Sequence, residues 1–409
     1  MKTPLSDIIG ALESGVSVNA EERPAITNES GVLKVSAVTG GDFKPEENKV
    51  VTSTDELQRL SCSPRAGDIL MTRANGSKDL VGCSVFIQKD YPNLFLPDKL
   101  WRIVLRDPTH DLSAWLFQVL NSESVREEVI NTASGSSGMR NISKSVFLNI
   151  RVNRPEYPEQ KAIVTVLSTW DRGIRQLTDL IAAKLRFKQG LMQQLLSGHR
   201  RFKGFGKPSN DTGQLPEGWK RLKASELFGN FTQKKNDDED LLSVTQDRGV
   251  IPRTMLKGKV VMPESGTGGY KLVEPGNFVI SLRSFQGGLE YSQYRGLVSP
   301  AYTVLKPCQT INDAFFRHYF KSYDFIQRLA VAVIGIRDGK QISYNDFESV
   351  KLPKPPIEEQ ERIAAVLDIS DREINLLGKQ LEALKQQKKG LMQKLLTGEV
   401  RVKLSKGVV

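Results

Sequence analysis

Residues 159–203 read EQKAIVTVLSTWDRGIRQLTDLIAAKLRFKQGLMQQLLSGHRRFK, and residues 359–403 read EQERIAAVLDISDREINLLGKQLEALKQQKKGLMQKLLTGEVRVK. Aligned without gaps at an offset of 200 residues, the two stretches share 20 identities in 45 positions. A repeat this far apart indicates a duplicated chain, because solenoids repeat at much shorter periods of roughly 20–50 residues. The sequence therefore predicts a pseudo-symmetric molecule built from two similar halves.

Both copies predict long helices. Their apolar residues alternate in spacing between three and four, which is typical of a stripe that packs against another helix. No proline interrupts 159–197 or 359–397, and Gly198 and Gly398 are suited to end the two helices. At 1.5 Å per residue, about 39 residues make a rod of roughly 58 Å. The expected seam consists of Ile174, Leu177, Ile181, Leu191, Leu195, Ile374, Leu377, Leu381, Leu391 and Leu395.

The seam is interrupted at the same place in both copies, by Lys188 and Lys388. A polar residue at a seam position can fix the register of two helices. Alternatively, each lysine extends its methylenes along the rim and keeps its ammonium group in water. The sequence leaves both interpretations open.

Two globules of about 150 residues surround the first helix in the chain, at 1–157 and 204–357. Both contain short β-type runs bounded by Gly, Pro, Asn and Asp, together with helical pieces, so each predicts a mixed α/β fold. The runs that favour strands are 68–71, 100–105, 278–282 and 302–305, and those that favour helices are 112–120 and 314–329. The expected division is a first globule at 1–157, a central helix at 158–203, a second globule at 204–357 and a C-terminal helix at 358–409.

The globules are distant copies of each other. Residues 67–73 (GDILMTR) correspond to 276–283 (GNFVISLR), and RNIS at 140–143 corresponds to KQIS at 340–343. The ends of the globules keep the offset of 200 residues, while in their middle parts the offset changes. We expect the two halves to differ mainly in these middles.

Composition favours a polyanionic partner. The chain has 58 Lys and Arg against 47 Asp and Glu, a net charge of +11. Nucleic acid is the leading candidate, and a merely basic soluble protein is the alternative. Three scattered cysteines and three histidines lack metal-ligand spacing, so neither a zinc site nor a disulfide framework is expected. Without a signal core or a long apolar run, a soluble cytoplasmic protein is expected.

Catalytic motifs are not evident. An amino-group methyltransferase needs an Asn/Asp-Pro-Pro-aromatic loop, and no such tetrapeptide occurs. The glycine-rich run at 265–269 lacks the spacing of a dinucleotide or phosphate loop and indicates a surface turn. We therefore expect no enzyme activity and no metal in this chain.

The order globule, helix, globule, helix resembles the specificity subunit of type I restriction-modification systems. The resemblance rests on Glu-Gln at 159–160 and 359–360, on the ending GLMQxLL[S/T]G of both helices, and on LPEGWK at 215–220. The first globule lacks a Pro-x-Gly-Trp entry, so its N-terminal edge near Leu5 stays open.

The resemblance implies a fold and a set of partners. Each globule would be a target recognition domain that reads one half of a bipartite double-stranded DNA site. The two helices would be antiparallel, set the gap between the half-sites and dock two methyltransferase subunits, and the complex would recruit restriction/translocase subunits. S-adenosylmethionine, ATP and Mg²⁺ would act on the partner subunits, with no cofactor in this chain.

Polar and basic residues in loops of the globules are the candidates for DNA contact, because phosphate contacts position a protein and base-edge contacts specify sequence. They are Arg73, Asn75, Lys78, Arg140 and Asn141 in the first half, and Arg283, Ser284, Gln286, Arg337, Lys340 and Gln341 in the second. Two other hypotheses remain at this stage. One is a coiled-coil scaffold that binds proteins, and the other is a self-contained DNA-modifying enzyme.

Overall fold

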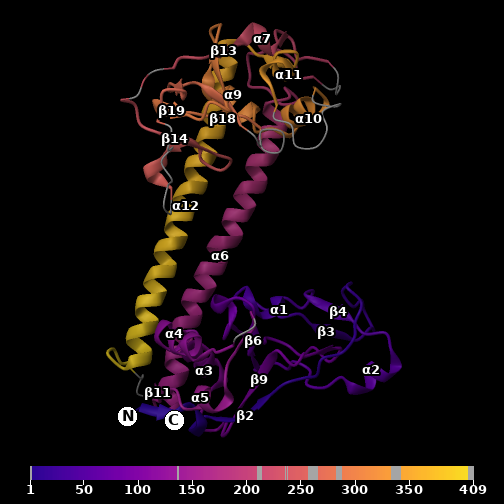
Figure 1. Ribbon diagram of the computed structural model, residues 1–409, viewed down its shortest axis with the longest axis vertical. Helices are drawn as coiled ribbons and strands as arrows, with labels where there is room; N and C mark the ends of the chain where they lie inside the picture. Colours follow the sequence, from indigo (N-terminus) through magenta and orange to yellow (C-terminus); the bar gives the residue numbers. More distant parts are fainter. Residues whose placement is uncertain are drawn as a thin grey trace. The chain divides into compact units, whose positions relative to one another are not determined.

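The computed structural model describes residues 2–135, 138–209, 214–234, 236, 238–256, 266–281, 288–332 and 342–403. They form two compact units. Unit 1 consists of Met1–Thr178 with Lys379–Val409, and unit 2 consists of Asp179–Gly378. Each unit therefore combines one globule with one half of each long helix (Figure 1).

The two long helices are α6, Tyr157–Leu195, and α12, Ile357–Thr397, as the repeat predicts. Prolines accompany both starts, where a missing N–H is tolerated. Gly198 and Gly398 follow the helix ends with φ of +75° and +76°, a backbone conformation that suits glycine and ends a helix. The prediction of both helices and of their glycine stops is confirmed.

Within each unit, the two helix segments run antiparallel. In unit 1, Glu159 pairs with Arg401 and Asp171 pairs with Lys388, so the residue number rises on α6 as it falls towards the start of α12. In unit 2, Lys184 pairs with Glu373 and Lys188 with Asp371, which gives the same direction.

The globule of unit 1 contains short strands and helices between β1 and β11. The strands are β1 Lys2–Pro4, β2 Ile9–Glu13, β3 Gly31–Leu33, β4 Asn48–Val50, β5 Ile69–Thr72, β6 Ala74–Asn75, β7 Ser84–Phe86, β8 Leu94–Phe95, β9 Leu100–Leu105, β10 Arg140–Asn141 and β11 Arg151–Asn153. The α-helices are α1 Ser36–Thr39, α2 Thr54–Arg59, α3 Ser113–Leu120, α4 Glu123–Thr132 and α5 Lys144–Leu148, with 3-10 turns η1 Leu5–Asp7 and η2 Lys78–Leu80.

The globule of unit 2 follows the same plan. Its strands are β12 Lys220–Lys223, β13 Phe228–Phe231, β14 Leu242–Thr245, β15 Gly249–Pro252, β16 Lys271–Val273, β17 Phe278–Ile280, β18 Glu290–Tyr291, β19 Gly296–Val298, β20 Thr303–Pro307 and β21 Lys351–Lys354. Its helices are α7 Ala224–Leu227, α9 Asp313–Tyr319, α10 Tyr323–Ala332 and α11 Tyr344–Glu348, with the 3-10 turn η3 Arg253–Met255.

Both globules share a four-stranded antiparallel sheet, in the order β2-β9-β5-β7 in unit 1 and β13-β20-β17-β18 in unit 2. Three helices follow each sheet at an offset of 200 residues. The β1–β11 pair corresponds to the β12–β21 pair, so the first globule has the same edge ribbon although it lacks the Pro-x-Gly-Trp entry. The duplication inferred from the sequence is therefore a duplication of structure.

The hydrophobic core of each unit includes both helix segments. In unit 1, Ile163, Leu167 and Leu395 join the globule core around Trp101 and Trp115. In unit 2, the core contains Leu195, Ile363 and Leu367 together with a cluster of phenylalanines from the sheet and from α9 to α11. Each globule is thus fixed by apolar burial to its own unit's helix pair.

One expected helix is corrected. Residues 314–329 form two helices, α9 and α10, separated by a turn at 320–322. Ser322 explains the break, because its hydroxyl accepts a hydrogen bond from the N–H of Phe325 at 3.3 Å and so caps a new helix. The periodic apolar pattern continues across the turn, which is why it predicts one helix.

The middles of the globules differ. Unit 1 has a three-stranded sheet, β4-β3-β8, with α1 packed on a small second core. In the described part of unit 2, the corresponding region consists of two two-stranded pairs, β14-β15 and β16-β19. The conserved four-stranded sheet thus carries different outer structures.

Candidate nucleic-acid interface

In unit 1, the structure brings together the two loop segments expected to contact DNA. Strands β6 and β10 pair antiparallel, with Arg140 opposite Asn75 and Asn141 opposite Ala74. The N–H of Ile142 also donates to the carbonyl oxygen of Arg73 at 3.0 Å. Segments about 65 residues apart in the chain therefore form one ribbon at the edge of the globule.

The five predicted side chains on and next to this ribbon are not equally available. The Asn75 side-chain oxygen accepts the N–H of Ser77 at 2.9 Å, so it stabilises the turn. Arg73 is half-buried and donates to the carbonyl oxygen of Asp98 at 3.5 Å. Lys78, Arg140 and Asn141 are exposed. These last three have the freedom to contact a ligand.

Arg126 of α4 holds the loop between β6 and β7 in place. The sequence does not predict this role, because Arg126 lies in a helix outside the loop. Its guanidinium donates to the carbonyl oxygens of Val81 at 2.8 Å and Asp79 at 3.1 Å. The hydroxyl of Thr72 donates to Leu80 at 2.6 Å from the other side. The loop between β6 and β7 is therefore tied to the core at its second half.

The candidates in the second half lie outside the described residues. This concerns Arg283, Ser284, Gln286, Arg337, Lys340 and Gln341. The flanking elements β17, β18, α10 and α11 match β5, β7, α4 and α5 of unit 1. The assignment of these six residues stays a prediction.

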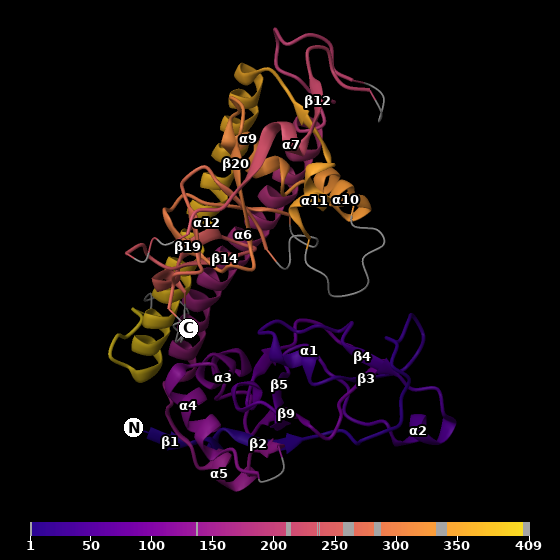
Figure 2. The same ribbon diagram turned by 45° about the horizontal axis from the view of Figure 1, so that its top comes forward.

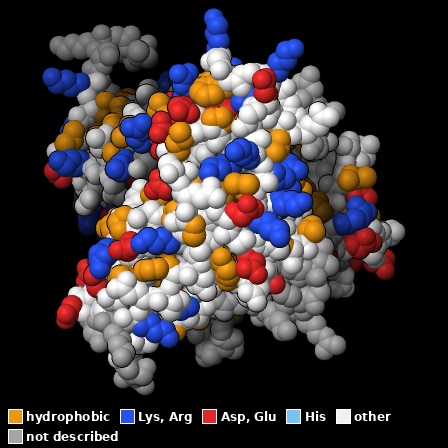
Figure 3. All heavy atoms as spheres, turned by 90° about the horizontal axis from the view of Figure 1, so that it is seen from above, with side chains coloured by type: hydrophobic (Ala, Val, Ile, Leu, Met, Phe, Trp, Pro, Cys, Tyr) orange, Lys and Arg blue, Asp and Glu red, His pale blue; other side chains and the backbone are white. Residues whose placement is uncertain are grey.

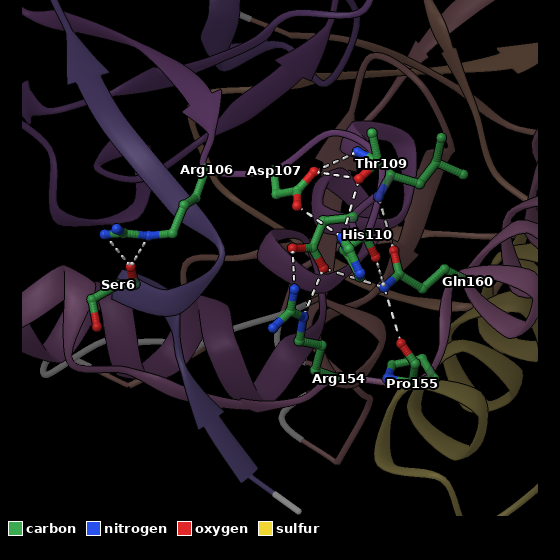
Figure 4. A network of polar contacts seen from close by, with 10 residues as sticks. Ser6, Arg106, Asp107, Thr109, His110, Arg154, Pro155 and Gln160 are labelled. Atoms are coloured by element: carbon green, nitrogen blue, oxygen red, sulfur yellow. Dashed lines mark hydrogen bonds and ion pairs between the residues drawn. The ribbon is translucent and has the colours of Figure 1, made fainter.

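The glutamine at the start of each long helix ties the helix to its globule, and Figure 4 shows this for Gln160. The side-chain oxygen of Gln160 accepts the N–H of Leu112 at 2.9 Å, and its amide donates to the carbonyl oxygen of Pro155 at 3.0 Å. Gln360 does the same with Asn312, at 2.9 Å, and Pro355, at 2.7 Å. One buried amide thus joins the last strand, the helix after the sheet and the long helix in both units.

Around Gln160, unit 1 adds an ion pair. Asp111 is fully buried, and Arg154 binds it through two hydrogen bonds of 2.9 and 2.7 Å (Figure 4). In unit 2 the corresponding residues are Ile311 and Lys354. The junction is therefore ionic in one unit and partly apolar in the other.

The glutamates Glu159 and Glu359 bind arginines that follow the end of the opposite long helix. Arg201 forms two hydrogen bonds of 2.9 and 2.8 Å with Glu359, and the indole N–H of Trp219 donates to the same carboxylate at 2.8 Å. Arg401 binds Glu159 in the same bidentate way. Both arginines are therefore held in ion pairs.

The ten predicted seam residues are half-buried, except Leu195 and Leu395, which are buried. Lys188 and Lys388 each reach an aspartate of the other helix within their own unit, Asp371 and Asp171, at 2.5 Å. The interruptions of the seam are thus matching ion pairs. This arrangement supports the interpretation that the lysines fix register.

One group with metal-ligand geometry occurs among the described residues, and it is already neutralised. His318, Asp368 and Asp371 offer atoms within 4.8 Å of one another. Asp368 is paired with Arg317 and Asp371 with Lys188. Burial lowers the pKa of His318, although a hydrogen bond to Asp368 opposes the shift. A cation would have to compete with two fixed positive charges here.

None of the helices in the described part of the chain combines the length and the apolar character needed to cross a membrane.

Known proteins share both sequence and fold with this chain. Residues 216–386 match the protein family described as Type I restriction modification DNA specificity domain. The chain is 25% identical over 376 residues to the type I restriction enzyme MjaVIII specificity subunit of Methanocaldococcus jannaschii, which covers 88% of this chain and 82% of that protein.

Two solved structures share the fold. The S subunit of a type I restriction-modification system from M. genitalium aligns with a TM-score of 0.56 and 15% identity, over 99% of this chain and 96% of that chain. A chain from a structure on complex assembly and conformational transition of the type I R-M system aligns with a TM-score of 0.58 and 18% identity, over 98% of both chains. At these identities the likeness supports the fold.

Proposed function

This chain belongs to the specificity subunits of type I restriction-modification systems, a non-catalytic DNA-recognition family, and we propose that each of its units reads one half of a bipartite DNA site. The observation that carries the proposal is the duplication. Two units repeat the same sheet, the same three helices and the same helix junction, but carry different outer structures. Two recognition units with the same fold are suited to bind two short DNA sequences separated by a gap.

In unit 1, we assign the reading to the β6–β10 ribbon. Arg140 and Asn141 are consecutive exposed residues of β10, and Lys78 follows β6. Arginine matches guanine and asparagine matches adenine in the major groove, each contact contributing about 1–3 kcal/mol of discrimination. Lys78 is suited to a phosphate, which positions the ribbon without reading sequence. Asn75 shapes the turn in this proposal.

The helices would set the gap between the half-sites and dock two methyltransferase subunits. Unit 2 has a groove of about 620 Å³ between α6 and α12, lined by Phe187, Leu191, Val366 and Ile369 among others. Phe187 and Ile369 are 62% and 56% exposed and line the same groove, so they form an apolar surface that a partner would cover. An apolar helix of the modification subunit would fit this groove.

The chemistry would reside in the partners. S-adenosylmethionine would bind to the methyltransferase subunits, and ATP and Mg²⁺ to the restriction/translocase subunits. This chain would supply only the recognition of the DNA sequence. We propose the cytoplasm as the place of action, because DNA and the partner subunits meet there.

The first test is single-molecule mapping of N6-methyladenine in the host genome, with and without the gene. Loss of methylation at one bipartite motif, two short halves around a fixed gap, is expected. An unchanged methylome in cells that express the partner subunits would contradict the proposal and favour a scaffold that binds proteins.

A second test separates the units. Exchanging residues 67–145 for those of a relative should change one half of the motif, and a change in both halves would contradict one reader per unit. Inserting equal whole turns after Leu180 and Gln380 should lengthen the gap and keep both halves. An unchanged gap would contradict the role of the helices.

A further inference from the structure

The edge ribbon of unit 2, formed by β12 and β21, is strongly basic. Its register places Lys220 opposite Lys354 and Lys223 opposite Lys351, with Arg221 between the two lysines of β12. Lys220, Arg221, Lys223 and Lys351 are exposed. Figure 2 places β12 at the end of unit 2 away from β14 and β19, and Figure 3 shows Lys and Arg side chains interspersed with Asp and Glu on the face seen from above.

This arrangement opposes folding. Residues directly opposite in an antiparallel pair have Cβ atoms roughly 4.5–5.5 Å apart, and like charges there are destabilising. Among the described residues, none of these five cations is in an ion pair. Lys354 donates to the side-chain oxygen of Gln309 at 2.6 Å, a neutral acceptor. The ribbon therefore carries uncompensated positive charge on a surface where acidic residues would stabilise it.

The structural role of the ribbon does not require these charges. In unit 1, the equivalent β1–β11 ribbon places Lys2 opposite Asn153, Thr3 opposite Val152 and Pro4 opposite Arg151. No two cations face each other there, and Arg151 donates to the backbone carbonyl of Lys2 at 2.8 Å. Both ribbons connect a globule to its helices, so the basic pairs are a property of unit 2 alone.

We propose that the β12–β21 ribbon is a second DNA-binding site, which holds the phosphate backbone of duplex DNA outside the half-site that unit 2 reads. The proposal rests on the proposed function, since it takes DNA as the ligand. Side chains alternate along a strand, so Arg221, Lys223 and Lys351 share one face of the ribbon and can contact neighbouring phosphates there. Such contacts are independent of base sequence. The repulsion between the facing lysines is then relieved in the bound state. Unit 2 contributes non-specific affinity, and unit 1 does so much less through its ribbon.

The test uses the full chain with Lys223→Gln and Lys351→Gln combined. Binding is measured at several salt concentrations to a duplex with the methylated motif and to a duplex without it. Two lost phosphate contacts should reduce the slope of log K against log [salt] by about 1.8, and affinity at 0.1 M salt by roughly tenfold per contact. The loss should be equal for both duplexes, and the motif in the methylome should stay the same.

Two controls accompany it. Lys161→Gln with Lys379→Gln makes the same charge change on exposed helix residues of unit 1 and should leave the slope nearly unchanged. Lys223→Arg with Lys351→Arg should retain binding. The glutamine variant should melt no lower than the wild type, because it removes a repulsion, so lost binding cannot be ascribed to unfolding.

Three outcomes would overturn the proposal. An unchanged slope for both duplexes would exclude a DNA contact and indicate an acidic protein partner. A loss restricted to the duplex with the motif would make the ribbon part of the base-reading site. An equal loss in the control variant would mean that only net charge matters. Failure of the proposed function is separate, because the wild-type chain would then show no preference for the motif.

Discussion

The same ion pair occurs in both units, and it is buried in only one of them. In unit 2, the side chains of Arg201 and Glu359 are 2% and 1% exposed, and Trp219 closes over them. In unit 1, Glu159 is 8% exposed, but its partner Arg401 is 72% exposed. Trp219 belongs to the LPEGWK segment that opens the second globule, and no tryptophan donates to Glu159 among the described residues. One segment thus changes the environment of a duplicated contact.

Unit 1 places its buried charge elsewhere. The Asp111–Arg154 pair supports the helix junction there, where unit 2 has Ile311 and Lys354. The shared amides of Gln160 and Gln360 bind the same backbone groups in both units. The comparison shows that the geometry of the junction is kept by a neutral amide, while the charged contacts around it changed after duplication.

The largest expected difference follows from Glu359→Gln compared with Glu159→Gln. Removing Glu359 leaves Arg201 charged and buried, which should destabilise unit 2 by about 3–5 kcal/mol. Removing Glu159 leaves Arg401 in water and should cost much less, because an exposed ion pair is screened by solvent. Hydrogen exchange at the first turns of α12 and α6, together with denaturant unfolding, measures both. Equal losses in the two units would show that burial does not decide the strength of this contact.

A second experiment converts the junction of unit 1 into that of unit 2. Asp111→Ile alone leaves Arg154 without its carboxylate and should cost about 2–3 kcal/mol. Adding Arg154→Lys reproduces the Ile311–Lys354 combination and should recover part of the loss, since neighbouring changes are not additive. The unfolding free energies of the two single variants and the double variant form the cycle. If the loss of unfolding free energy in the double variant equals the sum of the losses in the two single variants, the two positions act independently.

Much of the scaffold was predictable because it depends on local pattern. The helices, their glycine stops and the core strands follow from periodicity and turn residues, and the repeat confirms each prediction twice. Distant polar contacts were not predictable. Arg201 and Glu359 lie 158 residues apart, and each alone is ordinary for a helix end. Their contact depends on the tertiary arrangement that brings the end of α6 next to the start of α12, and sequence periodicity does not encode that arrangement.

The candidate site was predictable in part for the same reason. The polar character of the loop residues at 73–78 and 140–141 predicts DNA contact, and the structure pairs 74–75 with 140–141 in one ribbon. The sequence could not separate Asn75, which stabilises a turn, from Arg140, which is exposed. It also missed Arg126, because a positioning residue on a helix has no pattern of its own. Residue type therefore identifies candidates for DNA contact, and the hydrogen bonds in the structure show which of them already have a structural role.

A third prediction concerns pH and sharpens the contrast between His318 and its counterpart Gln118. His318 of α9 faces Arg317 of the same helix, Asp368 and Asp371 of α12, and Lys188 of α6. Burial lowers its pKa below the ordinary 6.5. As pH falls below 6.5, the unfolded chain binds a proton before the folded one does, so unit 2 should lose stability, at most about 1.4 kcal/mol per pH unit. Thermal unfolding between pH 7.5 and 5.5 should show this loss in the wild type.

The control is His318→Gln, which copies unit 1 and should flatten the pH dependence of unit 2. Exchange protection in unit 1 should not change in either protein over the same range. If the variant keeps the wild-type dependence, another group in unit 2 is responsible.

The smallest effect is expected where the two units agree. Lys188 pairs with Asp371 and Lys388 with Asp171, and the aspartate side chains are 45% and 36% exposed, so Lys→Met at either position should cost about 0.5 kcal/mol or less. The two interpretations of the seam lysines then separate by a different measurement. If the lysines only cover the rim, the double variant Lys188→Met with Lys388→Met keeps uniform hydrogen exchange along α6 and α12. If they fix register, the all-apolar seam permits slipped pairings, and exchange in the middle of the helices splits into two populations. The two effects can be separated because the expected loss of stability is near zero. A changed exchange pattern at an unchanged unfolding free energy would then reflect a choice among alternative helix pairings.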